Sequence, residues 1–230
     1  MNFDNQGYFR FYFTDHIYFT INDTIIATWI IGAILITLAV IVRIKIKNFK
    51  EVPETKFQNI IEAIVEKFDD YVVSIMTKEY AYFGSWFFGV FVFLMVANIF
   101  GIFAPMRTPT ADLALTFALG ISTVVLMQII GIRHNKDYIK DFFRPFPLFM
   151  PLNIVSDLSK SISLSIRLFG NMLGGLIIMT LMYELLPLAL NIAFPAVLSL
   201  YFDIFAGLLH AFIFFTLSMY FMMMKAPPQD

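Results

Sequence analysis

The segment from Ser163 to Gly175, SLSIRLFGNMLGG, places an arginine, Arg167, in a very apolar part of the chain, with Asn171 one helical turn later. On a helix, one continuous face would carry only polar, charged or small residues: Asn153, Ser156, Lys160, Ser163, Arg167, Asn171 and Gly174. Lipid does not tolerate such a face, so we expect it to point at protein or water. Arg167 could be paired permanently with a buried carboxylate such as Asp203, which would fix helix packing. Alternatively, Arg167 could remain available to interact transiently with a charged group.

A second group of ionisable residues lies in the last apolar segment. Asp203 and His210 are seven residues apart, which puts them two turns apart on one face of an α-helix, with Gly207 between them. Glu184 precedes this segment, near the hairpin that leads into it. A carboxylate, an imidazole and a small residue on one face can line a wet cleft, and histidine exchanges protons near neutral pH. The alternative is that His210 is a satisfied core residue.

The composition indicates a membrane protein. Of 230 residues, 59% are hydrophobic and only 14% are charged, whereas a soluble domain has about 25% charged residues. Too little polar surface is present to cover a globule, so lipid must cover much of it. The absence of cysteine excludes disulfides and thiolate metal sites, and a net charge of −1 gives no argument for nucleic acid. The N-terminus lacks the pattern of a cleaved signal.

The sequence predicts one all-α membrane domain over residues 1–230. After an outer N-terminal segment, 1–23, five stretches are long enough to span a bilayer: 24–42, 84–104, 113–132, 153–182 and 192–224. Pro187 and Pro195 bracket the expected hairpin between the last two spans. Residues 54–76 show apolar residues at the helical period opposite a charged face, which predicts an interfacial helix. The alternative for 54–76 is an amphipathic helix packed on a soluble domain.

The basic residues predict the orientation. Three regions hold 12 of the 16 lysines and arginines, namely the stretch between the first two spans, the stretch between spans three and four, and the residue after span five. An odd number of spans puts these regions on one side, whereas the opposite side holds only Arg10 and Arg107. By the positive-inside rule, the N-terminus is outside and the C-terminus is cytoplasmic, or in the organellar equivalent.

Several motifs resemble one family. The segment SLSIRLFGNMLGG resembles the signature of subunit a of F-type ATP synthases, the membrane stator of the rotary motor. NIFGIFAP, followed by PTADLALTFALG from Pro109 to Gly120, matches this family as well. VPETKFQNIIEAIVE is similar to its interfacial helix. The resemblance covers Val52 to the C-terminus.

The resemblance implies a partner with a membrane-embedded carboxylate on each of its subunits, the ring of c subunits. Protons or sodium ions would enter one half-channel, travel on the ring and leave by an offset half-channel. The last two spans would form a long tilted hairpin against the ring. The other implied partners are the peripheral-stalk b subunits and the F1 sector, and the implied location is the bacterial inner membrane, or less readily an organellar inner membrane. The resemblance implies neither a cofactor nor a metal.

By motif match, Arg167 is the stator arginine and electrostatic gate, and Asn171 is the asparagine that orients it. We expect Asp203, His210 and Glu184 to line the outer half-channel. Four residues would border the inner one: Ser156, Asp157, Lys160 and Ser163. Gly170, Gly174 and Gly175 would allow close approach of the ring, with static helix packing as the alternative. The chain departs from the family at Leu176, where many members carry a carboxylate or histidine. Asp203 and His210 also stand where some bacterial members have histidine and glutamine.

Two other function classes remain open. A secondary ion transporter or channel would need internal repeats and a complete set of carboxylates in one chain, and neither is evident. A structural scaffold would leave Arg167 permanently paired. The chain carries no phosphate loop, metal cluster or nucleophilic triad, so we expect a non-catalytic, ion-translocating subunit.

Overall fold

The fold is taken from a computed structural model of the chain. It describes residues 9–14, 17–50, 55–103, 108–134, 138, 146–185 and 193–226. Several predicted features lie outside the described residues, among them Arg107, Pro187, the start of the last expected span at residue 192, and three of the basic residues between spans three and four.

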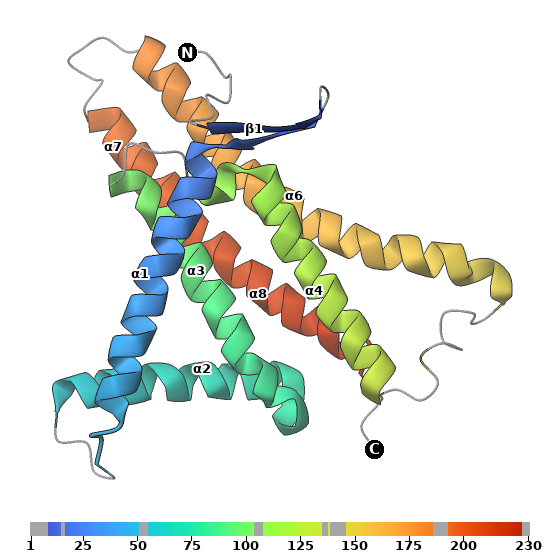
Figure 1. The fold of residues 1–230 in the computed structure, drawn as a ribbon. Helices are drawn as coiled ribbons and strands as arrows, with labels where there is room; N and C mark the ends of the chain where they lie inside the picture. The colour runs from blue at the N-terminus through green and yellow to red at the C-terminus, as the bar shows by residue number, and fades with distance from the viewer. Residues whose placement is uncertain are drawn as a thin grey trace.

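In the described part of the chain, five helices are long and apolar enough to cross a membrane, which confirms the predicted fold class. They are α1 (Asp23–Ile46), α3 (Gly84–Phe103), α4 (Leu113–His134), α6 (Met150–Leu185) and a final helix that contains three parts. The parts are α7 (Ala193–Ser199), η4 (Leu200–Ala206), which is a π-helix, and α8 (Gly207–Met223). In Figure 1, α6 and α8 run past each other obliquely, with α4 beside them.

The predicted interfacial helix is α2 (Lys56–Tyr80), which lies crosswise at one end of α1 and α3 (Figure 1). Its first turn is capped by Thr55, whose hydroxyl accepts a hydrogen bond from the Gln58 amide at 3.2 Å. Near its end, Thr77 has φ 61° and ψ 166° and interrupts the helix. The short 3-10 turn η1 (Ala81–Phe83) then leads into α3. The charged residues of α2 are all exposed.

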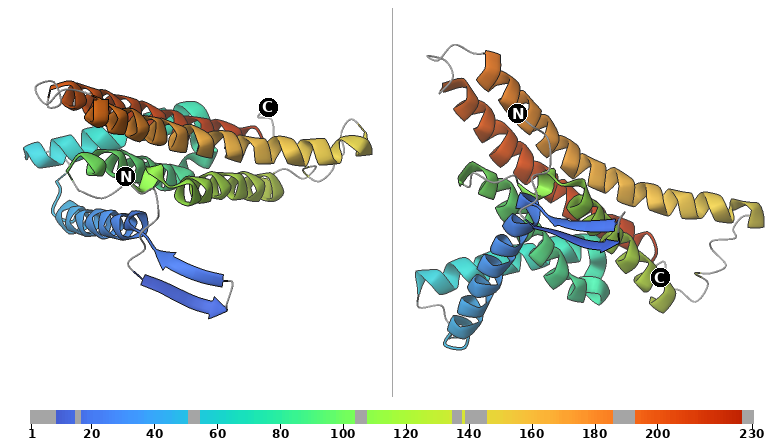
Figure 2. Two further views of the ribbon diagram at one scale, coloured as in Figure 1. Left: turned by 90° about the horizontal axis from the view of Figure 1, so that it is seen from above. Right: turned by 45° about the horizontal axis from the view of Figure 1, so that its top comes forward.

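The N-terminal segment forms a β-hairpin, which the sequence analysis did not predict. Strand β1 (Phe9–Thr14) pairs antiparallel with β2 (Ile17–Ile21), with Phe11 opposite Phe19 and a shift in register between Tyr12 and Thr14. Figure 2 shows the hairpin extending away from the helices. Aromatic and β-branched residues dominate both strands, and these residue types favour extended backbone.

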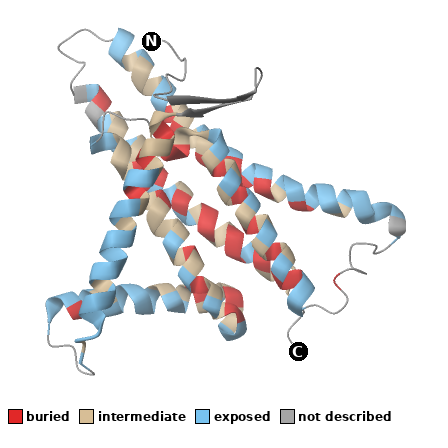
Figure 3. Cartoon of the chain, viewed as in Figure 1, coloured by how far each residue is buried: buried red, intermediate tan, exposed pale blue. Residues whose placement is uncertain are grey.

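The core lies among α3, α4, α6 and α8. One cluster joins α2, α3, α4 and α8 through the buried residues Val72, Met76, Tyr80, Phe87, Ile130, Phe215, Met219 and Met222. A second cluster joins α3, α6 and α8 through Leu94, Leu164, Leu168, Ala211 and Phe214. Figure 3 shows that α1 and much of α6 are exposed by contrast. Large apolar side chains are exposed on α1, among them Trp29, Ile36 and Leu38, and they suit contact with lipid.

Candidate functional site

Helix α6 presents two adjacent faces. One is buried against the rest of the chain and contains Asp157, Ser161, Leu164, Ser165, Leu168, Met172 and Gly175. The predicted polar stripe lies beside it, and none of its residues is buried: Ser156 and Ser163 are exposed, whereas Arg167 and Asn171 are half-buried. Packing among the described residues therefore leaves the stripe partly accessible, and Arg167 is half-buried on it.

The guanidinium of Arg167 has no ion pair or hydrogen bond with any residue that the structure describes. The suggested permanent partner, Asp203, instead accepts a hydrogen bond from the Ser199 hydroxyl at 2.8 Å. The nearby ionisable group is His210, which is close enough to Arg167 for a charge interaction. Asn171, the other residue of the motif, contacts the Met172 sulfur at 3.9 Å. The structure thus brings Arg167 and His210 together but does not pair Arg167 with Asp203.

Asp203 lies in the π-helix η4, whereas His210 lies in α8. The expectation that they share one helix face assumed an uninterrupted α-helix, and the wider π turn changes this relation. The Nδ1 atom of His210 is buried and has no hydrogen-bond partner among the described residues. Glu184 is exposed near the end of α6. The three predicted outer residues therefore lie on three different elements.

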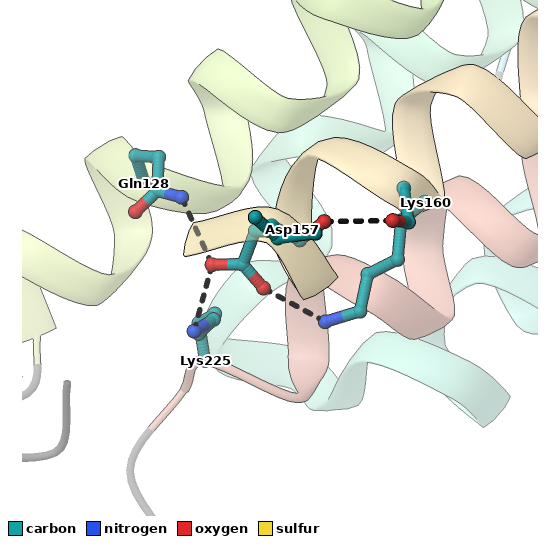
Figure 4. A network of polar contacts seen from close by, with 6 residues as sticks. Gln128, Asp157, Lys160 and Lys225 are labelled. Carbon is teal, nitrogen blue, oxygen red and sulfur yellow. Dashed lines mark hydrogen bonds and ion pairs between the residues drawn. The ribbon is translucent and has the colours of Figure 1, made fainter. Parts of the chain in front are cut away.

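At the inner end of α6, Asp157 is the centre of a polar cluster drawn in Figure 4. Its carboxylate oxygens lie 2.9 Å from the Lys160 ammonium and 2.9 Å from the Lys225 ammonium. The Gln128 amide donates a third hydrogen bond to it at 3.2 Å. We call these four residues the inner clasp, because they join α4, α6 and the residues after α8. Of the predicted inner residues, Asp157 and Lys160 are together here, whereas Ser156 and Ser163 are exposed on the stripe.

Tyr138 packs beside the inner clasp, outside the membrane-spanning helices. Its ring lies 5.6 Å from the Lys225 ammonium, and a Cβ at Gly131 would collide with it. Burial, with a smaller contribution from the negative charge of Asp157, raises the pKa of the Tyr138 hydroxyl to about 12. The phenol therefore stays neutral at physiological pH, and Asp157 has no second anion beside it.

The three glycines predicted to face a ring differ in their surroundings. A Cβ added at Gly170 or Gly174 would have nothing within 4 Å, so both face open space. A Cβ at Gly175 would lie 3.2 Å from the Phe202 Cβ, so Gly175 permits close packing between α6 and η4. Static packing within the chain therefore accounts for Gly175, whereas close approach of a partner stays a prediction for Gly170 and Gly174.

Two further polar groups come from motifs to which the sequence analysis gave no role. Asn98, in NIFGIFAP, donates a hydrogen bond to the Gly207 carbonyl at 2.8 Å and accepts one from Thr110 at 2.8 Å. Asp112, in PTADL, accepts from the Ala114 amide at 2.9 Å and from the Thr24 hydroxyl at 2.7 Å. It therefore caps α4 and ties it to α1. The presence of a polar residue within an otherwise apolar motif is the sequence signal that could have identified Asn98 and Asp112 as candidates.

Within the described part of the chain, no group of three or more histidines and carboxylates could hold a metal ion. The site therefore consists of an open arginine on a spanning helix, a neighbouring imidazole and a carboxylate in a π-helix. These features define a multi-pass helical membrane protein with ionisable groups on its spanning helices.

Comparison with known proteins identifies the family. Residues 25–223 match the family described as ATP synthase A chain, and the chain belongs to this family. It is 36% identical to ATP synthase subunit a of Desulfosudis oleivorans, over 86% of this chain and 85% of the relative. It is 32% identical to "ATP synthase subunit a, sodium ion specific" of Propionigenium modestum, over 87% of this chain and 73% of the relative. These bacterial relatives and the five apolar helices indicate a multi-pass bacterial membrane protein of the ATP synthase complex.

Proposed function

We propose that this chain is the stator subunit a of a rotary F-type ATP synthase, in which Arg167 is the electrostatic gate between two offset aqueous half-channels. Protons or sodium ions would pass through these half-channels to and from the carboxylates of the c-subunit ring. The observation that carries the proposal is the state of Arg167, which is half-buried on the polar stripe of α6 and has no counter-ion among the described residues. A purely structural scaffold would instead require a permanent partner for this charge.

The gate follows from elementary electrostatics. A ring carboxylate that faces lipid must be neutral, because an unpaired charge in hydrocarbon is very unfavourable. Beside a fixed cation the charged carboxylate is favoured, so the ring releases its ion there. Arginine suits this role because its pKa is above about 12, so it stays charged and carries no proton itself.

The energies involved allow the ion pair between Arg167 and a ring carboxylate to form and to separate again. Two charges about 4 Å apart at an effective dielectric constant near 20 interact by about 4 kcal/mol. One charge that crosses about 180 mV gains roughly 4 kcal/mol, from about 2.3 kcal/mol per 100 mV. Since these energies are comparable, the driving force is sufficient to release each carboxylate from Arg167. A dry pair at much lower dielectric would be too strong and would stop the rotor.

The remaining residues receive roles from their places along the path. Asp203, His210 and Glu184 would line the outer half-channel. Ser156 and Ser163 are open on the stripe, toward the inner end of α6, and would border the inner half-channel. Asp157 and Lys160 would form its wall, because the inner clasp already engages both. Asn171 would orient the gate region.

The other assignments follow from the family. The subunit would be non-catalytic, with ATP chemistry in other subunits, and its partners would be the c-ring, the peripheral-stalk b subunits and, through the complex, F1. We propose that the N-terminus is outside and the C-terminus is cytoplasmic, since 12 of the 16 basic residues fall on one side. No cofactor is proposed, because the transported ion binds the ring.

The test is Arg167→Ala in the assembled synthase, with ATP-driven and gradient-driven turnover measured in sealed vesicles. We expect loss of coupled transport, while the exposed Arg133 at the end of α4 provides a matched control in Arg133→Ala. Coupled transport at the wild-type rate in Arg167→Ala would end the gate assignment. Asp203→Ala should slow ion entry while the complex still assembles, and a defect in assembly alone would make Asp203 structural.

The choice of ion requires a separate measurement. The Propionigenium modestum relative is named as sodium ion specific. We therefore propose to titrate Na⁺ at constant pH and to measure ATP hydrolysis by the whole complex. Stimulation by Na⁺ would indicate a sodium motor, and its absence would indicate a proton motor.

A further inference from the structure

The last spanning helix changes type between two residues of the proposed outer pathway. Asp203 lies within the π-helix η4, and α8 begins at Gly207, before His210. In a π-helix each amide bonds to the carbonyl five residues earlier, whereas in an α-helix it bonds to the fourth. The point at which one pattern gives way to the other therefore fixes the rotation of Asp203 relative to His210. Such π segments are frequent at functional sites.

A buried side chain of another helix holds this point. Asn98 of α3 is 2% exposed and donates from Nδ2 to the Gly207 carbonyl at 2.8 Å. Its Oδ1 accepts a hydrogen bond from the Thr110 hydroxyl at 2.8 Å, and Thr110 is 0% exposed. Because both ends of the amide are engaged, the amide group cannot rotate without losing a buried hydrogen bond.

The helices on either side leave little room for this part of the last span to move. A Cβ on Gly207 would lie 3.0 Å from the Asn98 Cβ and 3.1 Å from its Nδ2. On the α6 side, a Cβ on Gly175 would lie 3.2 Å from the Phe202 Cβ. The π-helix and its end are therefore held between α3 and α6, and the hydrogen bond from Asn98 determines their register.

We propose that Asn98 is a positioning residue for ion translocation, which sets the rotation of Asp203 relative to His210 through its hydrogen bond to the Gly207 carbonyl, with Thr110 holding the amide in place. The proposal rests on the proposed function. Asn98 touches a backbone carbonyl and a hydroxyl and acts on the pathway only through the last helix. Its loss should change how well the pathway takes up ions, in addition to any change in stability.

A merely structural role for Asn98 makes a different prediction. If the amide served only to satisfy buried polar groups, its loss would reduce the amount of assembled complex and the maximal rate. The ion concentration at half-maximal transport would then stay unchanged. The dependence of transport on ion concentration therefore separates the two roles.

The experiment uses Thr110→Val, which removes the hydroxyl at nearly constant shape, and Thr110→Ser, which keeps it. Asn98→Ala removes both hydrogen bonds. The control is Thr116→Val, because Thr116 is also 0% exposed and, among the described residues, its hydroxyl bonds only to the carbonyls of Asp112 and Leu113, four and three residues earlier. ATP-driven transport by the complete synthase in vesicles is measured against pH and against Na⁺ concentration, after the amount of assembled complex is determined.

We expect Thr110→Val to raise the ion concentration at half-maximal transport about 3- to 10-fold, the effect of one lost buried hydrogen bond. Asn98→Ala, which loses two hydrogen bonds, should raise it at least as much. Thr110→Ser and Thr116→Val should behave as wild type. An unchanged half-maximal concentration in Thr110→Val, with only the rate or the yield reduced, would overturn the proposal. If the complex with Asn98→Ala does not assemble, the comparison of Thr110→Val with Thr110→Ser tests the proposal.

This outcome is distinct from a failure of the proposed function. If the wild-type complex shows no ion-coupled transport, the proposed function fails. If Arg167→Ala abolishes coupling while Thr110→Val keeps the wild-type ion dependence, only the role of Asn98 is refuted.

Discussion

Replacing Asp157 with asparagine should weaken the chain more than replacing either lysine of the inner clasp. The carboxylate side chain is 5% exposed and pairs at 2.9 Å with Lys160 and at 2.9 Å with Lys225, whose side chains are 17% and 21% exposed. Asparagine keeps the shape and can still contact Gln128. It removes the negative charge, however, and leaves two ammonium groups close together.

The magnitude follows from this geometry. At 2.9 Å and an effective dielectric constant near 20, each pair gains about 6 kcal/mol before desolvation is counted. Desolvation offsets most of this gain, yet removing one partner from a buried pair still costs about 3–5 kcal/mol. Because the lysine ammonium groups reach water, we expect the lower end, about 3 kcal/mol, for Asp157→Asn. For Lys225→Ala we expect about 1–2 kcal/mol, since Lys160 continues to pair with the carboxylate.

The assay is reversible unfolding of the purified chain in mixed detergent micelles, followed by circular dichroism, as a double-mutant cycle between Asp157 and Lys225. We expect a coupling energy of about 1–2 kcal/mol. The control is Asp69→Asn, because Asp69 is exposed on α2 and has no partner among the described residues; its effect should stay within about 0.5 kcal/mol. If Asp157→Asn is no less stable than Lys225→Ala, or the coupling energy is zero, the inner clasp does not hold α6 to the end of α8.

Four further predictions each concern one substitution, and the same unfolding measurement tests the effect of each on stability. Asp112→Ala should cost about 1–2 kcal/mol, because it removes the cap of α4 and the bond from Thr24; an unchanged stability would show that the cap contributes nothing. Thr77→Gly should stabilise the chain by about 1 kcal/mol, since it relieves a positive φ at a β-branched residue, and a loss of stability would contradict this. Gly120→Ala should destabilise by about 1–3 kcal/mol, because its Cβ would lie 2.9 Å from the Ser161 carbonyl oxygen. Gly170→Ala, with open space around it, should leave the isolated chain at least as stable but slow rotation in the complex, and normal rotation would end its assignment to the ring surface.

The spanning helices and the interfacial helix could be predicted because their signals are local. Long charge-poor runs have one stable form in lipid, since helices satisfy their own backbone groups. The apolar residues of α2 recur every 3.6 residues, which indicates a helix with one apolar face and one charged face. The stripe through Arg167 was predictable for the same reason, because residues three and four apart share a face wherever the helix lies.

The pairings between distant segments could not be predicted. The bond from Asn98 to Gly207 joins residues 109 positions apart, and no local pattern selects Gly207 among the acceptors of the last helix. The inner clasp depends on the end of α8 reaching the start of α6, which is a result of tertiary packing. The π-helix at Asp203 also has no compositional signal, so the prediction that Asp203 and His210 share one face assumed a regular α-helix.

The N-terminal hairpin was not predicted for a different reason, which is the shortness of its strands. Its aromatic and β-branched residues favour strands, yet two strands of six and five residues are also short enough to be taken as an irregular segment. The surroundings of Gly175 were missed because small residues in membrane helices serve both internal packing and contact with partners. Only the position of Phe202 distinguishes these uses for Gly175.

The length of α6 has a geometric consequence. Its 36 residues give a contour of about 54 Å at about 1.5 Å per residue, whereas the hydrocarbon layer is about 30 Å thick. A helix of this length either crosses the layer obliquely or extends beyond it. On an oblique course, its two ends would reach opposite surfaces at places far apart in the plane of the membrane. Arg167 follows Met150 by 17 residues and precedes Leu185 by 18, so it lies at the midpoint. Two water-filled routes that follow α6 inward would then open at laterally separated mouths and meet only at this one guanidinium.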